Sequence, residues 1–124
     1  MIEKFNFTSP TIPPLEGYTQ DIGLEYKSER GYGWITQESV GSDNVVPLDI
    51  TANTRDRNTI EEDTLDSLIH LQYQQDFANP NSIETPAAWE YDIPNGQYIV
   101  TVGVGDPDFA NSNHVVNVEG NSLI

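Results

Sequence analysis

Apolar and polar residues alternate most clearly in the last third of the chain. Between residues 97 and 104, four apolar side chains at alternate positions would share one face of a strand: Tyr98, Val100, Val102 and Val104. Residues 87–93 alternate in the same way, and the Pro-Asn-Gly step at 94–96 between the two runs is typical of a hairpin turn. We therefore predict an antiparallel hairpin over residues 87–104, with the tyrosine and valine face turned toward the core.

Proline and glycine recur at short intervals along the rest of the chain and divide it into pieces of strand length. Further strands are predicted at residues 2–8 and 114–119, so the pattern as a whole favours an all-β fold. Residues 59–75 are ambiguous, because Thr59 has capping-box spacing and the apolar positions after it recur at helical intervals. Residues 68–73 alone have the length of a strand, and the local pattern leaves both interpretations open.

Composition and charge describe one small domain with a modest core, which we assign to residues 1–124. The chain has 20 acidic and 5 basic side chains, a formal net charge of −15, and 36% hydrophobic residues. Two Trp, six Tyr and four Phe are too much aromatic material for a disordered acidic tail. Five scattered basic residues do not make a patch for phosphate backbones or anionic lipid, which argues against nucleic-acid and membrane partners. No segment approaches the roughly 20 apolar residues of a membrane span.

Most of the sequence motifs that identify enzymes are absent from this chain. The absence of cysteine excludes disulfides, thiolate metal sites and a cysteine nucleophile. His70 and His114 lie far apart, and no serine occupies a nucleophile elbow. The glycines of residues 31–34 lack the third glycine and the helix of a phosphate-binding loop. We therefore predict a protein that is not an enzyme.

Aromatic and polar residues near the predicted turns and loops suit sugar recognition instead. Sugar rings present apolar C–H faces that stack on aromatic rings, and hydroxyl groups that bond to carboxylates, amides and guanidinium groups. The polar segments 36–63 and 74–86 are predicted loops, and loops commonly carry binding sites. Six residues are the candidate ligand-binding groups: Tyr32, Trp34, Arg55, Asp56, Asp106 and Asp108.

Each of these candidates also has a structural interpretation. The two aromatic residues could fill the core, because Trp and Tyr are highly buried on average. Arg55 and Asp56 could form an ion pair that locks the long loop. Asp106 and Asp108 are candidate Ca²⁺ ligands, because only hard oxygen ligands are available to a metal here, or they accept hydrogen bonds in a tight turn.

A series of short motifs spans nearly the whole chain. It includes Phe5-Asn6-Phe7, Gly31-Tyr32-Gly33-Trp34, Thr54-Arg55-Asp56-Arg57-Asn58, Leu68-Ile69-His70-Leu71-Gln72, Pro94-Asn95-Gly96-Gln97-Tyr98 and Gly105-Asp106-Pro107. In this order the motifs resemble malectin-like, galactose-binding-like carbohydrate-binding modules of secreted bacterial proteins. The resemblance implies a jelly-roll β-sandwich in which residues 68–73 form a strand. It also implies a non-catalytic carbohydrate-binding role at an extracellular or cell-surface location.

The end of the chain departs from this family pattern. Such domains continue with further strands beyond the Val-Glu-Gly turn, whereas this chain stops at Ile124. A sandwich without its last strands would have an open edge, which predicts either a fragment of a longer protein or strand exchange between copies in a homo-oligomer.

Two functions follow from these expectations. The first is a binding module for a neutral or cationic glycan, because a net charge of −15 disfavours strongly anionic glycans. The second is a structural or self-assembly subunit of an extracellular fibre or surface layer.

Overall fold

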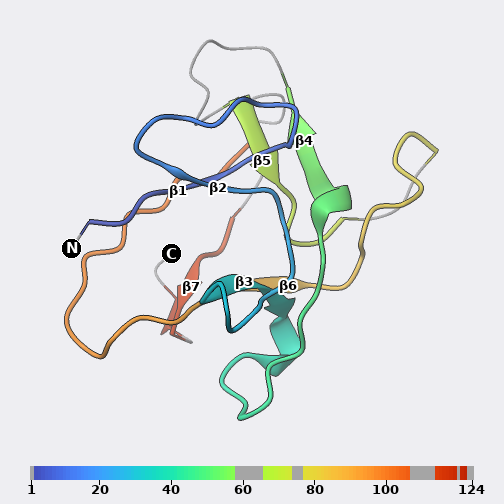
Figure 1. Cartoon of the computed structure of the whole chain (residues 1–124). Coiled ribbons are helices and arrows are strands. Elements are labelled where there is room, and N and C mark those ends of the chain that lie inside the picture. Colours follow the sequence, from blue (N-terminus) through green and yellow to red (C-terminus); the bar gives the residue numbers. More distant parts are fainter. Residues whose placement is uncertain (1, 58–65, 74–76, 107–113, 120, 123–124) are drawn as a thin grey trace.

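Short strands are the main regular elements of the chain. The computed structural model describes residues 2–57, 66–73, 77–106, 114–119 and 121–122 (Figure 1). In chain order the elements are β1 (Phe5–Phe7), β2 (Thr19–Asp21), β3 (Tyr32–Thr36), the 3-10 helices η1 (Gln37–Ser39) and η2 (Thr51–Asn53), β4 (Thr54–Asp56), β5 (Ser67–Ile69), β6 (Ala87–Tyr91), β7 (Asn117–Val118) and β8 (Asn121–Ser122). No long helix occurs in the described ranges, which agrees with the all-β prediction.

The strands associate in four pairs. β1 and β2 are parallel, whereas β3 with β6, β4 with β5, and β7 with β8 are antiparallel. Among the described residues each pair is a separate two-stranded sheet. The longest ladder joins β3 to β6 and places Trp34 opposite Trp89 and Tyr32 opposite Tyr91. Such cross-strand aromatic pairs stabilise a sheet beyond its backbone hydrogen bonds.

The hairpin predicted over residues 87–104 is wrong in its second half. Its first half is β6, but the partner of β6 is β3. Residues 97–104 lie in no strand, and the Tyr98 face that we predicted to be core is exposed. The physical reason is that β6 pairs with β3, which is distant in sequence, because this pairing lets Trp89 pack beside Trp34 and Phe7.

The other predicted elements have mixed outcomes. The strand expected within residues 2–8 is β1, and β7 lies within the expected 114–119. In the ambiguous segment, residues 67–69 form β5, so the strand that the family resemblance implied over residues 68–73 is confirmed only at its start, and residues 70–73 lie in no strand. Residues 58–65, with the predicted helix cap, lie outside the described residues.

The hydrophobic core is small and lies where β3, β5 and β6 meet. Its central cluster of buried residues is Trp34, Ile50, Ile69 and Ala87, and partly buried side chains of Phe7, Leu48, Ile83 and Trp89 pack against them. A core of this size is completed by buried polar residues, all of which need hydrogen-bond partners.

Asp21 provides the central polar contact of this core. Its carboxylate is buried and accepts hydrogen bonds from both tryptophan indoles, Trp34 Nε1 to Oδ1 at 2.9 Å and Trp89 Nε1 to Oδ2 at 3.0 Å. The backbone N–H of Gly23 donates to Oδ1 as well, at 2.9 Å. Asp21 thus joins the end of β2 to the β3–β6 pair, and no feature of the local sequence predicts this contact.

Candidate functional site

A surface hollow of about 300 Å³ lies beside the β4–β5 pair. We refer to it as the hollow; its lining residues are Ala52, Ala78, Asn79, Pro80, Asn81 and Ser82. The turn that forms most of it follows from the sequence, because proline suits the second position of a β-turn. The backbone N–H of Ser82 donates to the carbonyl of Asn79 at 3.2 Å and closes this turn.

Asn53 fixes the hollow to the strands. This fully buried amide donates from Nδ2 to the carbonyls of His70 (2.9 Å) and Ile83 (3.1 Å) and accepts from the Ile83 N–H at Oδ1 (2.7 Å). One side chain therefore joins η2, the end of β5 and the segment that follows the turn. The loop has a defined position because every polar atom of this amide is satisfied.

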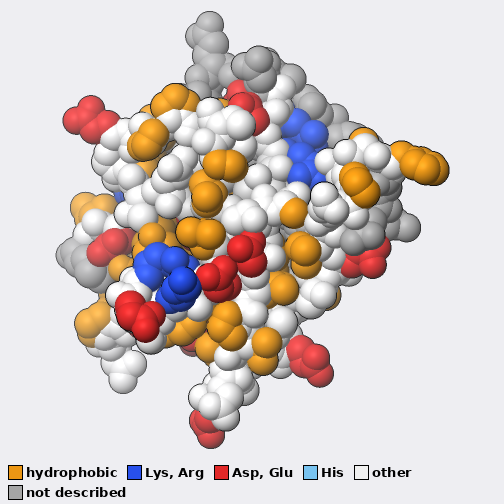
Figure 2. Space-filling view, turned by 45° about the vertical axis from the view of Figure 1, so that its right-hand side comes forward, with side chains coloured by type: hydrophobic (Ala, Val, Ile, Leu, Met, Phe, Trp, Pro, Cys, Tyr) orange, Lys and Arg blue, Asp and Glu red, His pale blue; other side chains and the backbone are white. Residues whose placement is uncertain are grey.

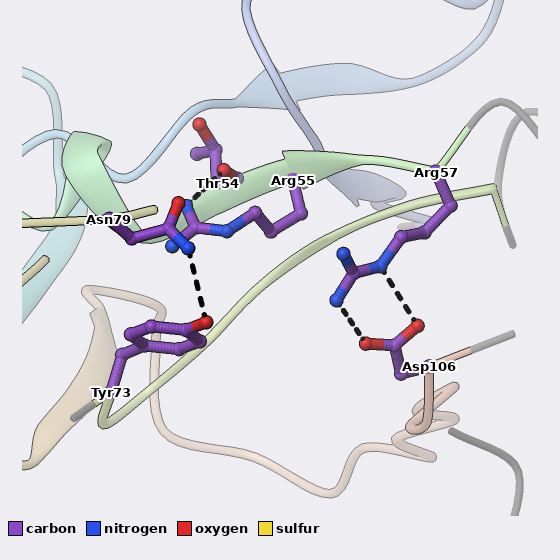
Figure 3. Close-up of polar contacts among 6 residues, drawn as sticks. All are labelled: Thr54, Arg55, Arg57, Tyr73, Asn79 and Asp106. Atoms are coloured by element: carbon purple, nitrogen blue, oxygen red, sulfur yellow. Dashed lines mark hydrogen bonds and ion pairs between the residues drawn. The ribbon is translucent and has the colours of Figure 1, made fainter. Parts of the chain in front are cut away.

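Arg55 borders the hollow and carries its positive charge. Its Nη1 donates to the carbonyls of Ala52 (2.9 Å) and Thr54 (2.7 Å), and its Nη2 donates to Ser82 Oγ (2.9 Å). The guanidinium carbon lies 4.7 Å from the centre of the Tyr73 ring. Figure 3 shows Arg55 directed toward Tyr73 and Asn79, and Asn79 Nδ2 donates to the Tyr73 hydroxyl at 3.3 Å.

The guanidinium of Arg55 keeps donors for a ligand. Arginine has five N–H donors, and the contacts with described residues use three of them. The Nε–H and one Nη2–H make no hydrogen bond to a described residue. Asn79, Asn81 and Ser82 line the hollow, and the buried Ser82 Oγ accepts the hydrogen bond from Arg55 Nη2.

The predicted Arg55–Asp56 ion pair does not form. Neighbouring residues of a strand point to opposite faces, so β4 directs the two side chains away from each other. Asp56 is exposed on the far side and accepts a hydrogen bond from Thr11 Oγ1 at 3.1 Å. Asp56 is therefore separated from the hollow.

Arg57 instead forms an ion pair with Asp106. Arg57 Nε donates to Asp106 Oδ1 at 3.0 Å and Nη2 to Oδ2 at 2.5 Å, with side chains only 20% and 8% exposed (Figure 3). Both carboxylate oxygens of Asp106, a predicted Ca²⁺ ligand, thus accept hydrogen bonds from Arg57, and a metal ion would have to displace the guanidinium group. Asp108 lies outside the described residues, within which no group of three acidic or histidine side chains could hold a metal.

Tyr32 and Trp34 belong to the β3–β6 pair and do not contact Arg55. Trp34 is only 3% exposed, so its ring is core, the structural interpretation that the sequence allowed. Tyr32 is half-buried among Phe5, Trp89 and Tyr91, with ring centres 5.1 to 6.4 Å away. An aromatic ring does lie beside Arg55, but it is Tyr73, which the sequence did not single out.

His70 lies next to this ring and has a buried ring nitrogen. The imidazole centre is 4.6 Å from that of Tyr73, and within the described ranges Nε2 has no hydrogen-bond partner. Burial lowers the pKa of His70 below its ordinary value, and the charges of Arg55 and Arg57 lower it further, while Asp106 acts in the opposite direction. The folded protein therefore holds His70 neutral at pH 7.

We expect this histidine to make the protein less stable in mild acid. Because the pKa of His70 is lowered in the folded state, the unfolded chain binds a proton more readily at this residue. The stability contribution of neutral His70 is therefore complete above the ordinary histidine pKa of about 6.5 and is lost as the pH falls below that value. The melting temperature of the wild type should drop between about pH 7.5 and about pH 5.5, and His70→Gln should reduce that drop. His114→Gln, at an exposed position, is the control and should keep the wild-type response. Equal drops in all three proteins would contradict this prediction.

Charged side chains are dispersed on the face drawn in Figure 2. Basic side chains form two small patches there, separated by polar and hydrophobic atoms, with acidic side chains nearby. Within the described ranges the structure contains no helix of the length and hydrophobicity that crossing a membrane requires. Comparison of the chain with family models, with curated proteins and with solved structures finds no match.

Proposed function

We propose that this chain is a non-catalytic carbohydrate-binding module at an extracellular or cell-surface location, and that the hollow binds a neutral glycan. One observation supports the proposal above the others. The hollow is lined by Asn79, Asn81 and Ser82, and the guanidinium group of Arg55, which donates to Ser82, lies over the ring of Tyr73. In this proposal the short strands are parts of a jelly-roll sandwich of the galactose-binding-like kind.

The chemistry of the hollow matches that of sugar hydroxyls. Each hydroxyl both donates and accepts, and the amide and guanidinium groups provide both kinds of partner in fixed positions. A volume of about 300 Å³ is at the lower end for small-ligand sites, which suits one or two sugar residues. A neutral ligand is favoured because the net charge of −15 repels polyanions and the Arg57 charge is already paired with Asp106.

A panel of neutral oligosaccharides, followed by calorimetric titration of the best binder, tests this proposal. Asn81→Ala should weaken binding about tenfold, because the loss of hydrogen bonds to a ligand costs on the order of 1 to 1.5 kcal/mol. Asn44→Ala removes the same amide from an exposed loop position away from the hollow and should leave the affinity unchanged. Absence of binding to every sugar, or equal affinities for the two variants, would overturn the proposal.

A further inference from the structure

Residues 97–104 form an exposed apolar segment that carries no charge. The exposed fractions are 43% for Tyr98, 98% for Ile99, 56% for Val100, 48% for Val102 and 52% for Val104. In a chain with a net charge of −15, the eight residues from 97 to 104 contain no acidic or basic side chain. Exposed apolar side chains that follow one another along a segment in this way are a candidate interaction site.

The backbone conformation of this segment is compatible with strand pairing. No residue from 97 to 104 has a positive φ, which an extended strand would exclude. No backbone N–H or C=O of the segment bonds to another described residue. Both ends are held, since the Tyr98 hydroxyl donates to the Pro94 carbonyl and Asp106 is paired with Arg57.

We propose that residues 97–104 pair with the same segment of a second copy of this chain, as antiparallel strands related by a two-fold axis at Thr101. The absence of charge selects this occupant, because two copies place no like charges opposite each other along the ladder, and a basic partner would find no acidic group on the segment. A two-fold arrangement of this kind uses the same surface of both copies.

The register follows from the side chains. About an axis at Thr101, Tyr98 lies opposite Val104 and Val100 opposite Val102, so the tyrosine and valine faces of both copies form one apolar layer. On the other face, Gly103 leaves room for the larger Ile99, and the two Thr101 side chains meet at the axis. Threonine pairs and β-branched pairs are favourable across antiparallel strands. This pairing is independent of the hollow and of any glycan.

A single introduced cysteine tests both the pairing and its register. The chain has no cysteine of its own, so Thr101→Cys provides one thiol per copy, directly opposite its symmetry mate. Opposed residues in antiparallel strands have Cα atoms about 4.5 to 5.5 Å apart, within the range of a disulfide. Mild oxidation should convert most of this variant to covalent dimer. Ser42→Cys, at an exposed position outside the segment, is the control and should not form dimer under the same conditions.

Analytical ultracentrifugation of the full chain provides the second measurement. The wild type should be in a monomer–dimer equilibrium that shifts toward dimer between about 20 mM and about 500 mM NaCl, because salt screens the repulsion between two chains of net charge −15. Val102→Lys should weaken dimerisation about 100-fold, since it removes one apolar side chain from each copy. Val102 is exposed in the single chain, so this variant should keep the wild-type melting temperature at a concentration where both are monomeric. A strictly monomeric wild type, assemblies larger than two copies, or equal crosslinking at positions 42 and 101 would each overturn the proposal.

Discussion

Replacing Asp21 with alanine is expected to lower the free energy of unfolding by about 4 kcal/mol, a large part of the stability of a domain of this size. The substitution leaves the indole N–H groups of Trp34 and Trp89 and the backbone N–H of Gly23 without their acceptor. Trp34 is buried, so water cannot replace that acceptor without opening the core. Thermal unfolding followed by tryptophan fluorescence should show a melting temperature about 15 °C lower than that of the wild type.

Asp21→Asn separates hydrogen bonding from the simple loss of a side chain. The amide keeps one acceptor oxygen for one indole, but its NH₂ group faces the other indole, so that two donors oppose each other. We expect a loss of about 2 kcal/mol, between the wild type and the alanine variant. Asp43→Asn makes the same change at an exposed loop position and should leave the melting temperature unchanged. If Asp21→Ala unfolded within a few degrees of the wild type, the hydrogen bonds from the two indoles to Asp21 would not be a major source of stability in this core.

The strands that local pattern predicted well are those with a buried partner. β1 and β6 alternate in sequence and each packs aromatic side chains into one cluster, where Phe5 and Phe7 contact Trp89. Residues 97–104 alternate just as regularly but have no partner strand among the residues that the structure describes. Alternation in the sequence shows which side chains would share a face of a strand. It does not show which other segment pairs with that strand.

The candidate site was partly predicted for a related reason. Arg55 was identified, but its expected partner Asp56 is its neighbour on a strand and points the other way. Its observed partners, Tyr73 and Ser82, come from segments 18 and 27 residues further along the chain. The Asn-Pro-Asn sequence at 79–81 does predict a turn, but only the buried amide of Asn53 brings that turn to the arginine.

Gly33→Ala is expected to be the second severely destabilising substitution, with a loss of about 4 kcal/mol. An added Cβ would lie 2.4 Å from the Cα and 2.5 Å from the backbone N of Tyr26, and the φ of +149° at this position is one that L-residues rarely adopt. The clash is with backbone, which cannot rotate away as a side chain would. The Tyr26 N–H donates to the Trp34 carbonyl at 2.9 Å and the Trp34 N–H donates to the Leu24 carbonyl at 3.1 Å, so relief of the clash breaks these bonds beside the core tryptophan.

Gly31 provides the matched control for this prediction, because it precedes the same strand and has a φ of +82° but no atom within 4 Å of an added Cβ. Gly31→Ala should therefore cost only the backbone strain, about 1 kcal/mol, whereas Gly33→Ala adds the steric clash. Urea denaturation of both variants measures the difference directly. Equal losses would mean that backbone conformation alone requires glycine here. A difference of about 3 kcal/mol would mean that steric room at Gly33 is what matters. The absence of a side chain there lets the segment from Leu24 to Lys27 lie against β3 and help bury Trp34.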